Sequence, residues 1–201
     1  MIATRRVLAA LLLGLIGMST MACSDQSPPA SSGPVAPSAA PPDPLRGLVD
    51  VAVRRIVLGD QVSAAKFGTP APIDDPPREQ QVLAQVGSSA GRAGVDPGEA
   101  ARFFGDQIAA SKVVQRGLYQ RWTEHPDQAP TSRPDLRTQV RPELDTITTQ
   151  LIDGLRDTTG PRHAPGCASA LNAASTHAGG QLDQLHRDAL VTALRGVCVH
   201  G

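Results

Sequence analysis

The chain has 201 residues, of which 40% are hydrophobic and 2% aromatic, and 19 basic and 19 acidic residues give a formal net charge of zero at pH 7. This balance lacks the basic excess of a nucleic-acid-binding domain, and so few aromatic side chains provide no stacking platform for bases. The cysteines and scattered histidines show no metal-ligand spacing, so we expect neither a nucleic-acid partner nor a metal site.

Residues 1–23 have the pattern of a secretory signal peptide. Arg5 and Arg6 precede a short apolar run, and small residues follow before Cys23. A charged region, a short apolar region and small residues, in this order, are typical of export, and the run is too short for a comfortable membrane span. We therefore expect an exported protein.

The stretch "TMAC", which ends at Cys23, resembles a bacterial lipobox, in which the cysteine becomes acylated. Residues 24–43 then form a tether rich in proline, serine and alanine, without apolar periodicity. We expect a lipid anchor at Cys23, which would hold the protein in the cell envelope and be its contact with the membrane. The alternative is ordinary cleavage near Cys23 and free release.

The cysteine count favours one disulfide. If Cys23 is acylated, Cys167 and Cys198 remain in an exported protein, where thiols tend to pair. Their bridge would close a loop of about 32 residues and stabilise the fold by roughly 3–4 kcal/mol in the chain-entropy model.

Residues 44–201 are expected to form one all-α domain, because apolar residues recur there with helical spacing and no segment alternates with period two. We expect about six helices: 45–66, a second that follows "DDPP", 97–122, 135–157, 165–178 and 180–198. The third has an N-cap at Asp96, Pro97 in its first turn and Glu99 three residues after the cap, which predicts a capping box. The segment "GPRHAPG" is expected to interrupt the helices.

Several polar residues do not fit a plain helical bundle. Arg78 of "PIDDPPREQQVLAQVG" lies in the first turn of the second helix, where the helix dipole disfavours a cation, so it either points into water or faces an anion. Arg55 and Lys66 are 11 residues apart, so they project from one helix face about 16 Å apart. Ser111 and Gln115 are neighbours on one face of the third helix.

The ordered set of Arg55, Lys66, "PIDDPPRE" and "FFGDQIAASKVVQ" resembles the AroQ class of chorismate mutases. The signal peptide, the added C-terminal helices and the cysteine pair make the chain similar to the secreted γ subclass of mycobacteria and related actinobacteria. The resemblance covers residues 44–198 and implies an AroQ-type helical bundle. It also implies the rearrangement of chorismate to prephenate without a cofactor, in a homodimer whose sites are each complete within one chain.

The resemblance implies a role for each matching residue. Arg55, Lys66 and Gln115 are the expected catalytic residues: Arg55 binds a substrate carboxylate, and Lys66 and Gln115 donate to the ether oxygen. Glu79 would accept from the ring hydroxyl, and Ser111 would lie near the ring carboxylate. The full expected substrate-binding set is Arg55, Lys66, Asp75, Arg78, Glu79, Ser111, Gln115 and Arg141.

At some positions the resemblance leaves two candidate residues, and at others this chain has a different residue from its relatives. In the dimeric cytosolic members, one arginine of the site comes from the partner chain, and in the secreted subclass an arginine of the same chain takes its place. We expect Arg141 to be that arginine, in preference to Arg137. Gln115 stands where some secreted relatives carry a glutamate that must be protonated to donate. Val82 stands where one relative has glutamine, so Glu79 would supply that contact. Lys112 lies about 100° round the helix from Ser111, so we expect it outside the site.

Two other functions remain open from the sequence. The chain could be a non-catalytic helical envelope lipoprotein with a mutase-like fold, although a decayed site should have lost Arg55, Lys66 or Arg78. It could also be a related lyase that acts on isochorismate and shares the AroQ fold. A bundle that binds a lipid would instead need an apolar cavity.

Overall fold

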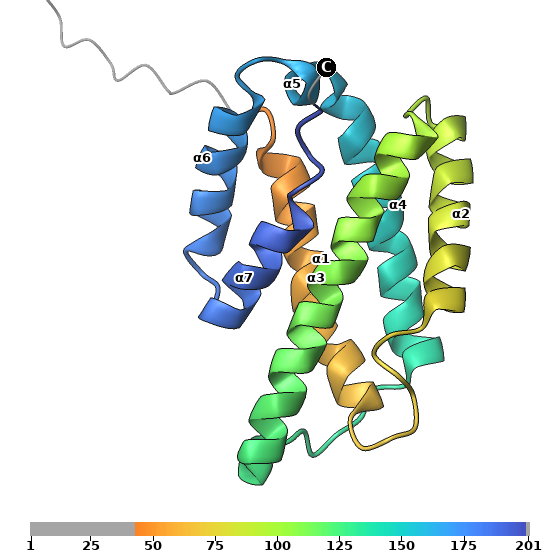
Figure 1. Ribbon diagram of the computed structural model, residues 1–201, viewed down its shortest axis with the longest axis vertical. Helices are drawn as coiled ribbons and strands as arrows, with labels where there is room; N and C mark the ends of the chain where they lie inside the picture. Colours follow the sequence, from red (N-terminus) through yellow and green to blue (C-terminus); the bar gives the residue numbers. More distant parts are fainter. Residues whose placement is uncertain (1–42, 200–201) are drawn as a thin grey trace, which may run out of the picture. The chain divides into compact units, whose positions relative to one another are not determined.

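The computed structural model describes residues 43–199, and every regular element in that range is helical (Figure 1). The elements are α1 (Arg46–Lys66), α2 (Pro76–Arg92), α3 (Pro97–Glu124), the 3₁₀ turn η1 (Pro126–Gln128), the π-helical turn η2 (Leu136–Val140), α4 (Arg141–Asp157), α5 (Thr159–His163), α6 (Cys167–Gly179) and α7 (Gln184–Ala193). The all-α prediction is confirmed. The expected signal peptide, nearly all of the tether and Cys23 lie outside the described residues.

None of the described helices is both long and apolar enough to cross a membrane.

Helix α3 is the central element of the bundle and packs against α1, α2 and α7 (Figure 1). Its consecutive residues Phe103 and Phe104 are both fully buried, so they fill the core on two sides of the same turn. A side chain of this size contributes about 1.5–3 kcal/mol when it leaves water. Gly59 of α1 lets that helix approach closely, because an added Cβ would lie only 3.3 Å from Val114 of α3.

The start of α2 is fixed by a reciprocal pair of caps. The carboxylate of Asp75 accepts the backbone N–H of Arg78 at 3.1 Å, and the carboxylate of Glu79 accepts the backbone N–H of Asp75 at 3.1 Å. These bonds satisfy donors that a helix N-terminus otherwise leaves free. They also fix the first turn of α2, which carries two of the expected site residues.

The capping box predicted for α3 is only half formed. Asp96 accepts the backbone N–H of Glu99 at 2.7 Å, but the Glu99 side chain does not return to the cap. It instead accepts from Arg162 at 3.1 Å and lies 3.1 Å from Nε2 of His163. A buried arginine needs a charged partner, and Glu99 serves that need in place of the local cap.

Helix α5 occupies part of the segment that was expected to be a break, so seven α-helices are described where about six were expected. Its last residues, Arg162 and His163, are held by Glu99, which gives this short helix a tertiary anchor. Helix α7 is shorter than expected and ends at Ala193, since the chain must turn there to bring Cys198 to Cys167.

Three interactions hold the C-terminal segments together and against the bundle. The expected disulfide between Cys167 and Cys198 is confirmed, and the backbone N–H of Val199 donates to the carbonyl of Arg162 at 3.0 Å. His186 of α7 lies 2.9 Å from Asp60 of α1. Burial opposes the charged imidazolium, but the two carboxylates of Asp183 and Asp60 outweigh it and raise the pKa of His186.

Removing the bridge should destabilise the domain without unfolding it. Replacing both Cys167 and Cys198 with serine should lower the free energy of unfolding by roughly 3–4 kcal/mol, because the unfolded chain regains the entropy of an open loop. Urea denaturation of the two proteins measures this difference. Titration of the native wild type should find no reactive thiol at either position, and two titratable thiols would contradict the bridge.

Candidate active site

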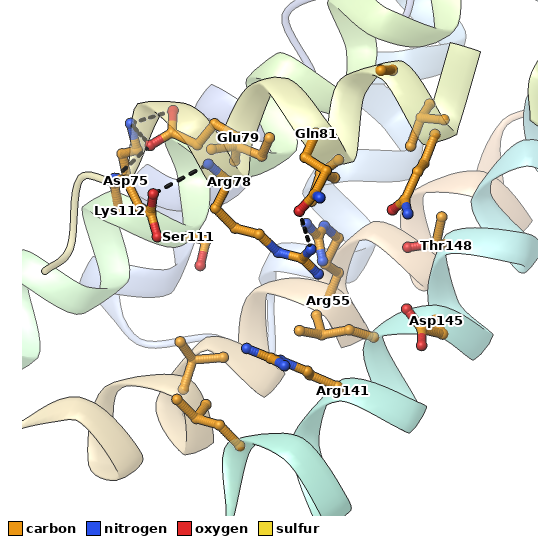
Figure 2. A pocket seen from close by; sticks show the side chains of 18 of the residues that line it. Arg55, Asp75, Arg78, Glu79, Gln81, Ser111, Lys112, Arg141, Asp145 and Thr148 are labelled. Atoms are coloured by element: carbon orange, nitrogen blue, oxygen red, sulfur yellow. Dashed lines mark hydrogen bonds and ion pairs between the residues drawn. The ribbon is translucent and has the colours of Figure 1, made fainter. Parts of the chain in front are cut away.

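A cavity of about 920 Å³ lies between α1, α2, α3 and α4, and the loop before α2 contributes Ala71, Pro72 and Ile73 (Figure 2). Its volume lies within the range of small-molecule sites. All eight residues of the expected binding set line this one cavity, although they come from four separate helices.

The lining is strongly cationic although the whole chain is neutral. Six basic side chains line it against three carboxylates, an excess of three positive charges: Arg55, Lys66, Arg78, Arg92, Lys112 and Arg141 against Asp75, Glu79 and Asp145. Such an excess in a concave, partly apolar site attracts small anions.

Arg55 is the most unusual of these cations. Its Nε is buried and has no hydrogen-bond partner, and no carboxylate among residues 43–199 forms an ion pair with its guanidinium. Burial lowers the pKa of Arg55 to about 10, so the group is still charged at neutral pH. A buried charge without a partner is costly, which marks this arginine as a candidate for anion binding.

Two further arginines line the cavity from opposite walls. Arg78 of α2 donates to the side-chain oxygen of Gln81 at 2.6 Å, and Arg141 is the first residue of α4, directly after the π-helical turn (Figure 2). Within the described residues neither pairs with a carboxylate. Arg137, the competing candidate, does not line the cavity.

Lys66, Gln115 and Ser111 form a hydrogen-bonded chain across the cavity wall. Lys66 donates to Oε1 of Gln115 at 3.2 Å, and Nε2 of Gln115 donates to the hydroxyl of Ser111 at 3.2 Å. Because a lysine ammonium can only donate, it fixes the orientation of the amide, and the NH₂ group of Gln115 must face away from it. Burial lowers the pKa of Lys66, whereas Asp75, Asp74 and Glu79 raise it in part.

Lys112 was expected outside the site, but it lines the cavity. Its Nζ lies 2.7 Å from both carboxylate oxygens of Glu79 (Figure 2). The same Nζ lies 3.1 Å from Oδ1 of Asp74. Lys112 lies about 100° around α3 from Ser111, and this places it on the side of α3 where α2 packs. Its side chain therefore faces α2 and not solvent. The helical spacing alone contains no signal for this contact, since it does not say where α2 lies.

Other cavity residues were not singled out from the sequence. Gln81 of α2 lines it, as do Asp145 and Thr148 of α4 (Figure 2). Gln85 of α2 lines it as well. Val82, the position where one relative has glutamine, also lines it. These polar residues resemble ordinary exposed helix positions in sequence, so only the pairing of α2 with α4 brings them together.

The arrangement suits binding and charge stabilisation. Three arginines can take the carboxylates of a small dianion through planar, bidentate contacts. Lys66 and Gln115 can donate to an oxygen that becomes negative, and Glu79 can accept from a hydroxyl. Among the described residues no group of three histidine, cysteine or acidic side chains is arranged to hold a metal ion.

Comparison with known proteins gives matches across the domain. Residues 46–116 match the model of the family described as chorismate mutase type II. The chain is 37% identical to a secreted chorismate mutase of Mycolicibacterium smegmatis over 77% of this chain and 86% of that protein. It is 32% identical to one of Mycobacterium tuberculosis over 77% of this chain and 78% of that protein.

Solved structures agree with these matches. The chorismate mutase of Burkholderia phymatum aligns with a TM-score of 0.75 and 32% identity, over 78% of this chain and 97% of that chain. That of Burkholderia thailandensis aligns with a TM-score of 0.72 and 40% identity, over 77% and 98%. With a cationic cavity of the geometry described above and relatives at this identity, the chain belongs to the chorismate mutase type II family.

Proposed function

We propose that this chorismate mutase binds chorismate in the cavity between α1 and α4 and converts it to prephenate with the eight residues named above. In the reaction the ether C–O bond breaks while a new C–C bond forms within the same molecule, so no atom or proton is gained or lost. The protein therefore has to select a compact conformer and stabilise the negative charge that gathers on the ether oxygen.

The unpaired guanidinium of Arg55 is the observation that supports this proposal most. Its cost in the folded protein is offset only when an anion enters the cavity. We assign Arg55, Arg78 and Arg141 to the two carboxylates of the substrate, because they project into the cavity from three helices and none has a carboxylate partner among the described residues.

The remaining roles follow from what each group can donate or accept. We assign Lys66 and the NH₂ of Gln115 as donors to the ether oxygen, and the bond of 3.2 Å from Lys66 to the amide oxygen places the two side chains next to each other. Ser111 lies next to the amide and is assigned to the ring carboxylate. Glu79 accepts from the ring hydroxyl, and Asp75, which caps α2, keeps Glu79 and Arg78 in position.

This arrangement also favours a mutase over the two other candidates. A non-catalytic envelope protein has no need to retain several cations that line one cavity, and Arg55, Lys66 and Arg78 are all present there. The isochorismate-acting lyase is disfavoured by the names of the mycobacterial relatives, which are secreted chorismate mutases.

Loss of chorismate absorbance with the purified protein tests the function directly. The wild type should turn over chorismate, and Lys66→Ala should lower kcat by about 10²–10³-fold while the melting temperature changes little, because it removes a donor used mainly in the transition state. Arg137→Ala, which removes a nearby exposed cation outside the cavity, is the matched control and should keep wild-type turnover. Near-normal turnover of Lys66→Ala would remove Lys66 from the mechanism.

The Gln115→Glu variant should make activity conditional on a proton. The amide of Gln115 donates at every pH, so the wild-type rate should vary little from mildly acidic to mildly alkaline conditions. An ionised carboxylate at this position would face an oxygen that is becoming negative. The variant should keep activity at low pH and lose it as the pH rises through the pKa of the new carboxyl group in the complex.

The environment of that new carboxyl group sets the midpoint of the loss. The ammonium of Lys66, which lies 3.2 Å from the Gln115 side chain, lowers the pKa of the carboxyl group introduced there. Burial and the dianionic substrate raise the same pKa. The pH–rate profiles of the two proteins measure the effect. Profiles of the same shape would show that residue 115 does not face the ether oxygen.

We also propose that the enzyme is exported, anchored by a lipid at Cys23, and a homodimer in which each chain holds a complete site. The secreted relatives support export, and the cavity lined from four helices of a single chain supports the complete site. Cys23→Ser should move the protein from the membrane fraction to the soluble exported fraction, as fractionation and immunoblotting would detect. Release of the wild type into the medium would contradict the anchor.

A further inference from the structure

Lys112 forms a close ion pair with Glu79 at the wall of the cavity. Its Nζ is 2.7 Å from both Oε1 and Oε2 of Glu79, so one ammonium binds the whole carboxylate group. The side chains are 19% and 26% exposed, respectively, so solvent screens this pair less than a surface ion pair. The hydrogen bond that Lys112 donates to Glu79 raises the pKa of Lys112 although burial opposes it, and the group stays charged.

Asp74, the other carboxylate near Lys112, has a second cationic partner in Arg116. Asp74 also lies 3.1 Å from Lys112, but Arg116 donates to both of its carboxylate oxygens, at 2.9 and 2.8 Å. Arg116 is 55% exposed and is absent from the lining of the main cavity. The charge of Asp74 is therefore shared between Lys112 and Arg116, whereas both oxygens of Glu79 are in contact with Lys112.

The negative charge of Glu79 would repel a dianionic substrate unless a cation neutralises it. As a carboxylate it is the right acceptor for a ring hydroxyl, but it faces a substrate that carries two negative charges. At an effective dielectric constant of about 20, like charges a few ångströms apart repel by more than thermal energy. A cation in contact with both oxygens of Glu79 reduces this repulsion and keeps the oxygens in one orientation.

We propose that Lys112 is a positioning residue of this enzyme, which neutralises and orients Glu79 so that the carboxylate can accept from the substrate hydroxyl without repelling the dianion. This inference rests on the proposed function. Lys112 acts through Glu79 and does not itself contact the reacting atoms. Its role accounts for a half-buried lysine that the assigned mechanism otherwise leaves without a task.

A set of variants assayed on chorismate tests this role. Lys112→Met should raise KM about tenfold with a smaller change in kcat, since a uniform repulsion of the dianion weakens binding in the ground and transition states alike. Added salt should reduce the defect, because it screens the exposed charge of Glu79. Lys112→Arg should restore most of the lost affinity. Arg116→Met, which removes the neighbouring cation that does not contact Glu79, is the matched control and should keep a KM within about twofold of wild type.

The combination with Glu79→Gln separates positioning from a structural effect. Glu79→Gln alone should raise KM, because the amide is a poorer acceptor for the hydroxyl. In the Lys112→Met background the same change should lower KM, because it removes the negative charge that has lost its partner. A merely structural lysine would not produce this reversal of sign. If Lys112→Met does not fold, as judged by circular dichroism, Lys112→Gln with and without Glu79→Gln gives the same comparison.

The outcomes are distinct. A reversal of sign together with rescue by arginine supports the proposal. An active wild type whose KM is unchanged in the folded Lys112→Met or Lys112→Gln protein would overturn this role alone, as would an equal penalty from Glu79→Gln in both backgrounds. A folded wild type that leaves chorismate unchanged would overturn the proposed function, and with it this inference.

Discussion

The cation Arg55, held in a cavity without a carboxylate partner among residues 43–199, is the constraint on which the rest of the structure depends. Burial lowers its pKa to about 10, and the folded chain must supply the free energy that keeps it there. Apolar packing around α1 and α3 contributes free energy that offsets this cost. The fully buried Phe103 and Phe104 and the close approach at Gly59 provide that packing.

The C-terminal helices contribute to this stability from the side of the bundle away from the cavity. The bridge from Cys167 to Cys198, the ion pair of Arg162 with Glu99 and the contact of His186 with Asp60 all lie outside the cavity lining. None of these groups has to move or change charge for the reaction. The site can therefore keep costly polar groups while other parts of the chain supply the stabilising contacts.

Inside the cavity, hydrogen bonds between the site residues fix donors and acceptors before any substrate binds. Lys66 orients the amide of Gln115, and the reciprocal caps of α2 hold Glu79. Preorganised dipoles of this kind need not rearrange as charge develops, which is the main catalytic contribution available to a one-substrate rearrangement. The pairing of Lys112 with Glu79 extends the same principle to a group that would otherwise repel the ligand.

The sequence by itself determined the helical class, the start signals of α2 and α3, the cysteine pair and, through family resemblance, the eight candidate residues, because these depend on periodicity, local caps and residue identity. It did not determine Lys112, Asp145 or Thr148, since exposed-looking positions become cavity walls only when α2 packs against α3 and α4. It also missed α5 and the half-formed cap of α3. Glu99 could pair either with the backbone N–H of the α3 cap or with the distant, buried Arg162, and it pairs with Arg162. An unpaired buried charge costs more free energy than an unpaired N–H at a helix terminus, and only the tertiary structure brings Arg162 to Glu99.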